Sequence, residues 1–130
     1  MGSPQLSSPA NFEQIVSKFG YNQVLKKRNR IDTSGQGGWD SDLKDVDIKF
    51  SYKSLDGELE VAFKNVEYVL NSMVSSWKDV YSVNSYHVNL AETREQVLYT
   101  MHRLFLKYIG TRGPIWEMNA DIIATAFTEQ

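Results

Sequence analysis

The chain has 130 residues, of which 42% are hydrophobic and 23% are charged, and its formal net charge at pH 7 is −2. A chain of this size and composition fills one ordinary globular domain, which excludes collagen-like, coiled-coil and wholly disordered proteins. It contains no cysteine, so disulfides, iron–sulfur clusters, thiolate zinc sites and thiol nucleophiles are excluded too.

The first ten residues, MGSPQLSSPA, combine prolines and serines without any periodic pattern. This composition is typical of a disordered tail, and it lacks the apolar stretch of a secretory signal. No run in the chain approaches the roughly 18 apolar residues of a membrane-spanning helix. We therefore expect a protein that is cytoplasmic and does not insert into a membrane.

Residues 11–45 begin with a helical pattern and then lose it. Asn11 is a candidate cap of a helix that carries Phe12 and Phe19 on one face, and Gly20 is its candidate end. A second helical segment is predicted from Tyr21 into the cations that follow, because cations suit a helix C-terminus. The glycine-rich stretch at about 32–45 predicts a flexible connector.

Residues 46–63 carry the clearest alternation in the chain. Apolar Val46, Ile48, Phe50 and Tyr52 alternate with polar residues, and Asp56-Gly57 precedes a second apolar run. Asp-Gly suits the two positive-φ positions of a type I′ turn. The pattern predicts an antiparallel β-hairpin.

The rest of the chain returns to helical periodicity. A helix is predicted over 66–81 with Asn65 as its cap, followed by a short strand over 83–90. Asn89 with Glu92 indicates a capping box that opens a helix running to about residue 110. Residues 119–128 fit both a helix and an edge strand, and we favour the helix.

The order of these elements predicts an α+β fold. We expect one domain over residues 11–130, in which an antiparallel β-hairpin and a short third strand pack against three to four helices.

Catalytic candidates are few. His102, Tyr99 and Glu95 share a predicted helix, and together they offer a base with an orienting carboxylate. A structural histidine explains the same triplet, so a small hydrolase or isomerase built around His102 is the weakest of our hypotheses.

Cofactor and metal motifs fail on their spacing. The segment Ser34-Gly35-Gln36-Gly37-Gly38 lacks the lysine of a phosphate loop, and the aspartates after it lack the glycine of a calcium loop. We expect no cofactor and no metal.

A basic segment offers a nucleic-acid hypothesis. It consists of Lys26, Lys27, Arg28 and Arg30, and Trp39 is a candidate stacking platform for a base. The segment also resembles a short nuclear import signal, so a nuclear location stands beside the cytoplasmic one. A solvated helix end is the alternative interpretation.

A turn near the C-terminus offers a protein interface. Arg112, Ile115 and Trp116 lie there, and Arg and Trp are common at interface hot spots. An unpaired sheet edge would also recruit a partner strand, with a homodimer as the simplest outcome.

These features favour a non-enzymatic protein-interaction module that acts as an adaptor, inhibitor or accessory protein. An RNA- or DNA-binding accessory protein is the second hypothesis. The small size and the scarcity of catalytic motifs also suit a viral accessory protein.

Overall fold

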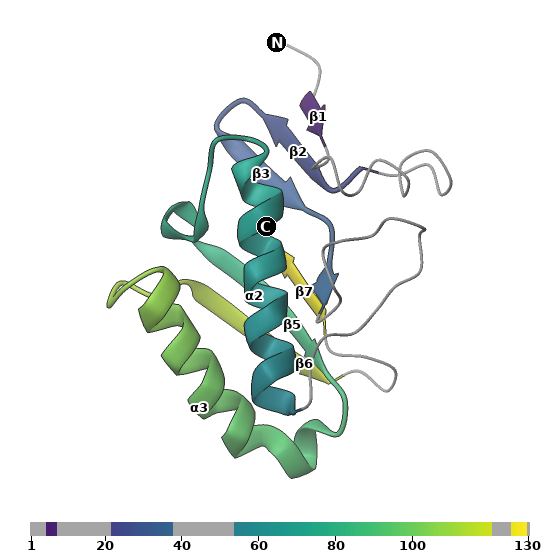
Figure 1. The fold of residues 1–130 in the computed structure, drawn as a ribbon, viewed down its shortest axis with the longest axis vertical. Helices are drawn as coiled ribbons and strands as arrows, with labels where there is room; N and C mark the ends of the chain where they lie inside the picture. Colours follow the sequence, from purple (N-terminus) through teal and green to yellow (C-terminus); the bar gives the residue numbers. More distant parts are fainter. Residues whose placement is uncertain (1–4, 8–21, 38–53, 121–125, 130) are drawn as a thin grey trace.

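The fold is α+β, as predicted, and Figure 1 shows two long helices lying against β-strands. The computed structural model describes residues 5–7, 22–37, 54–120 and 126–129. In chain order, the elements are β1 (Gln5–Ser7), β2 (Val24–Lys27), β3 (Arg30–Thr33), β4 (Gln36–Gly37), α2 (Leu55–Asn71), the 3-10 helix η2 (Trp77–Asp79), β5 (Ser82–His87), α3 (Leu90–Tyr108), β6 (Ile115–Ala120) and β7 (Ala126–Glu129).

The strands form two sheets. One is antiparallel with the order β1-β2-β3, and the other has the order β4-β7-β5-β6. In the second sheet β5 and β6 are parallel, whereas β7 runs antiparallel to both β4 and β5. A parallel pair needs a long crossover connection, and α3 supplies it between β5 and β6. None of the described helices is long and apolar enough to cross a bilayer.

Helix α2 replaces the predicted β-hairpin turn. Ser54 Oγ accepts a hydrogen bond of 3.1 Å from the backbone N–H of Gly57, so Asp56 and Gly57 lie in the first helical turn. The residues buried on this helix recur at helical spacing through Leu59, Phe63 and Val66, and this long apolar face outweighs the local Asp-Gly turn preference. The hairpin prediction is therefore wrong from residue 55 onward, and its first strand over 46–53 lies outside the described residues.

The predicted helix over 66–81 is correct only up to Asn71, because α2 starts earlier and ends there. Asn65 is no cap. It is buried in the middle of α2, and its Nδ2 donates a 2.8 Å hydrogen bond to the Gly37 carbonyl of β4. The helix is thereby tied to the second sheet.

The core is centred on aromatic residues between α2 and α3. Phe63 stacks on Trp77 with ring centroids 4.4 Å apart, and the Trp77 indole donates a 2.8 Å hydrogen bond to the Phe63 carbonyl. Phe105 of α3 packs against Phe63 at 5.6 Å. Because the indole N–H has this partner, burying Trp77 leaves no polar group without a hydrogen bond.

Strand β5 and helix α3 confirm the predicted strand and the second predicted long helix. The start of α3 differs from the prediction, because Asn89 has a left-handed backbone and makes no side-chain cap. Instead, Thr93 Oγ1 donates to the Asn89 carbonyl over 3.0 Å.

The remaining described segments are strands where we expected helix or no structure. The basic segment is the β2–β3 hairpin, in which Lys27 pairs with Arg30 across a turn and Arg28 takes a left-handed backbone. Residues 115–120 and 126–129 form β6 and β7, both paired with β5. Strands β6 and β7 depend on pairing with β5, and β2 pairs with β1 as well as with β3, so the local pattern does not contain all the contacts that decide these segments.

Two other expectations change in the same way. Gln5–Ser7 of the predicted tail pairs with β2, and residues 32–37 of the predicted connector belong largely to β3 and β4. The helix expected from Asn11 lies outside the described residues, as does Trp39.

The end of α2 provides a test of backbone strain. Val74 follows the helix with a φ of 55°, and its side chain is 99% exposed. A β-branched residue is strained in this region, whereas glycine is not. We expect Val74→Gly to raise the free energy of unfolding by about 1 kcal/mol in urea denaturation.

The matched control is Lys64→Gly, at an exposed position inside α2. It should lower the stability by about 1 kcal/mol, because glycine is a poor helix former. Equal losses in the two variants would contradict the strain at Val74.

Candidate functional site

A hollow of about 410 Å³ lies against the β1–β2–β3 sheet. Val24 and Ile31 pack against Val69 of α2 and against Met73, which follows that helix, so one face of this sheet is covered. Leu25 and its register partners alternate with those residues and lie on the opposite face. The hollow is lined by Leu6, Asn22, Gln23, Val24, Leu25, Asp32, Thr33 and Ser34.

Beside the hollow lies a cluster of polar side chains, which we call the amide cluster: Gln23 and Ser34, which line the hollow, and Gln36, which bonds to them and does not line it. Gln23 and Gln36 are 2% and 0% exposed. Gln23 Oε1 accepts hydrogen bonds of 2.7 Å from both Ser34 Oγ and Gln36 Nε2. The backbone N–H of Ser34 donates to the Gln23 carbonyl at 2.8 Å, which extends the β2–β3 ladder and fixes the cluster in place.

Two buried oxygens close to the hollow have no hydrogen-bond partner among the described residues. They are Gln36 Oε1, whose residue does not itself line the hollow, and Thr33 Oγ1, whose residue lines the hollow but pairs with Val24, so that its side chain lies on the covered face of the sheet. An unsatisfied buried polar group costs about 1–3 kcal/mol. A small molecule whose N–H or O–H donors reached these oxygens would recover that free energy, so the arrangement suits a ligand that is rich in donors.

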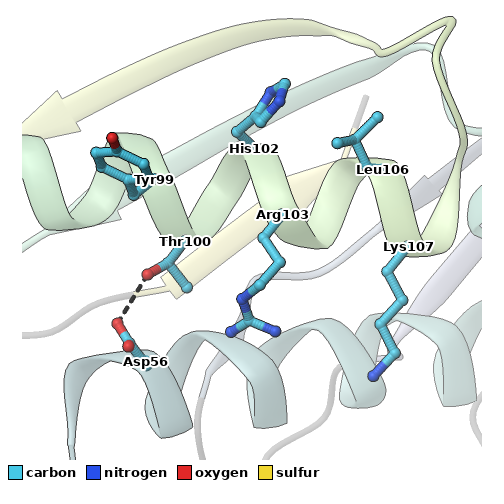
Figure 2. A pocket seen from close by; sticks show the side chains of 7 residues that line it. All are labelled: Asp56, Tyr99, Thr100, His102, Arg103, Leu106 and Lys107. Carbon is cyan, nitrogen blue, oxygen red and sulfur yellow. Dashed lines mark hydrogen bonds between the residues drawn. The ribbon is translucent and has the colours of Figure 1, made fainter.

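A second hollow, of about 580 Å³, lies along α3 beside the start of α2, and Figure 2 shows its lining. Asp56 Oδ1 accepts hydrogen bonds from Thr100 Oγ1 at 2.7 Å and from Gln96 Nε2 at 3.1 Å. These bonds lower the pKa of the Asp56 carboxyl. Lys107 pairs with Glu60 at 3.3 Å. Since its main polar groups already have partners, this hollow is a poorer candidate than the first.

The predicted catalytic residues belong in part to this second hollow. In Figure 2, Tyr99 and His102 lie on the side of α3 that faces away from α2, and both are exposed. Glu95 is exposed but does not line the hollow. Their catalytic role stays a prediction, and no metal-binding group of His, Asp or Glu occurs within the described ranges.

A buried histidine that the sequence analysis did not single out lies on β5. His87 Nε2 is 2.7 Å from Ser85 Oγ, which also accepts a 2.8 Å hydrogen bond from the Trp116 indole. Since the indole can only donate, Ser85 is free to donate its own proton to His87 Nε2. Burial lowers the pKa of His87 to about 4, so the imidazole is neutral at pH 7.

The predicted interface residues differ in their contacts and exposure, and their role at an interface stays a prediction. Arg112 Nη2 donates to the carbonyls of Val80 at 2.7 Å and Lys78 at 3.1 Å, so it braces the loop after η2. Trp116 is half-buried and lies edge-on to Phe105. Ile115 is 76% exposed.

The predicted nucleic-acid residues lie at the β2–β3 hairpin. Lys27, Arg28 and Arg30 line a third hollow of about 670 Å³, whereas Lys26 is half-buried and does not line it. The residues of the amide cluster were missed, because a buried glutamine has no periodic pattern that separates it from a solvated one. Ser34 and Gln36 fall in the glycine-rich segment Ser34–Gly38, which the sequence analysis interpreted as a flexible connector after its spacing failed to match a phosphate loop.

Comparisons with known proteins identify relatives of the chain. The family model described as endoribonuclease L-PSP matches residues 12–118. Among solved structures, the protein YJGH has a TM-score of 0.79 at 15% identity, covering 98% of this chain and 95% of that one. Rv2704 from Mycobacterium tuberculosis, of the YjgF/YER057c/UK114 family, has a TM-score of 0.71 at 14% identity, covering 98% and 97%. TdcF from E. coli has a TM-score of 0.70 at 12% identity, covering 84% of each chain. Among curated proteins, none matches.

These matches overturn the expected function. They exclude the generic protein-interaction module, the nucleic-acid-binding accessory protein and the viral accessory protein. The physical reason is that the basic segment belongs to a hairpin beside a small-molecule-sized hollow instead of a helix end. In the turn near the C-terminus, Arg112 donates hydrogen bonds to the backbone carbonyls of Lys78 and Val80.

The buried His87 predicts a pH dependence of stability. Its pKa in the folded chain, about 4, lies below the ordinary 6.5, so the unfolded state takes up the proton first. The stabilisation is complete above pH 6.5 and is lost as the pH falls toward 4. We expect a loss of about 2 kcal/mol between pH 7 and pH 5, measured by urea denaturation.

Two substitutions locate the effect. His87→Gln should flatten this pH dependence, whereas His102→Gln, at the exposed histidine, should leave it unchanged. A pH dependence that persists in the His87 variant would assign it to another group.

Proposed function

Because the chain belongs to the endoribonuclease L-PSP family, whose model matches residues 12–118, we propose that it binds a small polar metabolite of the amino acid type. Proteins of this family bind small molecules or are deaminase-like. The TdcF structure contains bound serine, which supports this class of ligand. The hollow beside the amide cluster is the site that we propose for it.

The observation that carries the proposal is the pair of buried oxygens, Gln36 Oε1 and Thr33 Oγ1, that lack partners among the described residues. An amino group supplies N–H donors to such acceptors, and its charge is compatible with the nearby Asp32 carboxylate. Leu6 and Leu25 on the same face offer apolar contact to the body of the ligand. The site therefore combines a few convergent polar groups with apolar walls, as small-molecule sites generally do.

We also propose a homotrimer in the cytoplasm, since proteins of this family commonly form homotrimers and are generally cytoplasmic. The nuclear alternative has no support. The trimer replaces the dimer through a sheet edge that the sequence analysis favoured.

Thr33→Val tests the proposed site. Valine has nearly the same shape without the unpartnered hydroxyl, so the variant should be about 1 kcal/mol more stable than the parent chain. It should also bind L-serine about five- to tenfold more weakly in calorimetric titration, because one ligand contact is lost.

Thr93→Val is the matched control on α3, far along the chain from the amide cluster. It should leave serine binding unchanged. Equal serine binding by all three proteins, or binding of single-stranded RNA in place of serine, would contradict the proposal.

The oligomeric state is tested by size-exclusion chromatography with light scattering. We expect a mass of three times the 14.9 kDa of one chain. A monomer at high protein concentration would contradict the trimer.

A further inference from the structure

The proposed ligand site continues past the amide cluster into the hollow at the basic hairpin. Leu25 and Asp32 line both hollows, so the two are neighbours on one face of the β2–β3 hairpin. Register pairs Leu25 with Asp32 and Lys27 with Arg30. Because side chains two residues apart share a face, Gln23, Leu25 and Lys27 form one row along β2.

The far end of this row is strongly cationic. Three cations, Lys27, Arg28 and Arg30, line the hollow at the hairpin, against the single carboxylate of Asp32. The chain as a whole has a net charge of −2, so this excess of positive charge is local. A low net charge with a concentrated cationic hollow favours one bound anion over general attraction to polyanions.

Arg30 is oriented toward such a ligand by Asp32. Its Nε lies 3.0 and 3.2 Å from the two carboxylate oxygens, while its side chain is 57% exposed. Both contacts use Nε, so the N–H groups of the two terminal nitrogens make no hydrogen bond within the described residues. Arginine presents these donors in a fixed fork that matches a phosphate or carboxylate.

The spacing sets the size of the ligand. Four residues separate Gln23 from Lys27, and a strand rises about 3.3 Å per residue, so the two ends lie about 13 Å apart. Free serine is too short to reach both. A ligand that used both ends would carry a donor group and an anionic group about 10 Å apart.

We propose that the basic hairpin is an anion subsite of the small-molecule site. In this arrangement, Lys27 and Arg30 bind the phosphate of an organic phosphate whose amino end contacts the amide cluster. The inference rests on the proposed function for its amino end only. Two adjacent cations favour a dianionic phosphate over a carboxylate with a single charge.

The test uses 6-aminohexyl phosphate, with hexylamine and inorganic phosphate as its two halves, in calorimetric or NMR titrations of the full chain. We expect the joined compound to bind at least tenfold more tightly than either half, since linked groups bind with a high effective concentration. The double variant Lys27→Gln/Arg30→Gln should lose this gain and leave the binding of L-serine unchanged.

The matched control is Lys64→Gln/Arg94→Gln, which removes the same charge from exposed positions on α2 and α3. It should bind the joined compound as the parent chain does. An equal loss in both double variants, or no gain from the phosphate, would overturn the subsite while serine binding still supported the proposed function. Tight binding of the joined compound that depends on Lys27 and Arg30, without any binding of serine, would support the subsite and overturn the proposed ligand class.

Discussion

The structure depends on the burial of one helix, α2, against two sheets. Its Val69 packs on Val24 of the first sheet, and its Phe63 belongs to the core that includes Val83 of the second. Midway between them, the buried side chain of Asn65 donates to the Gly37 carbonyl of β4. An amide buried without that acceptor would be costly, so this contact fixes the register of β4 along the helix. Because Gln36 precedes Gly37, the same contact positions the amide cluster.

The amide cluster is placed by tertiary structure but is not fully satisfied by it. Ser34 and Gln36 spend their donors on Gln23 Oε1, while Gln36 Oε1 is left buried without a partner in the described part of the chain. In contrast, the indole of Trp77 in the main core has its partner in the Phe63 carbonyl. The unsatisfied atoms thus lie near a hollow. Their lost hydrogen bonds lower the stability of the free protein, and a ligand that supplied those bonds would bind more tightly.

The sequence analysis succeeded where one element carries its own complete pattern. Helix α3 has buried residues from Val97 to Phe105 at helical spacing, and its type and approximate limits follow from that spacing. Strand β5 overlaps the strand predicted over 83–90, with an earlier start and end. The start of α2 was predicted wrongly, because Asp56-Gly57 has a strong local turn preference that only the longer apolar face of the helix outweighs. The β2–β3 hairpin was predicted wrongly because its cluster of cations resembles a solvated helix end. The site was harder still, since nothing local distinguishes the buried Gln36 from a solvated glutamine.

The same hairpin shows why stability alone does not account for its charges. The Arg30–Asp32 pair joins side chains that are 57% and 35% exposed, and an exposed ion pair contributes about 0–1 kcal/mol. Lys27 lies directly across the ladder from Arg30, so two like charges face each other at the narrow end of the hairpin and destabilise it. One carboxylate offsets only part of that repulsion. An arrangement that costs stability in the free chain, beside a hollow that an anion would fill, is accounted for more simply by binding than by folding.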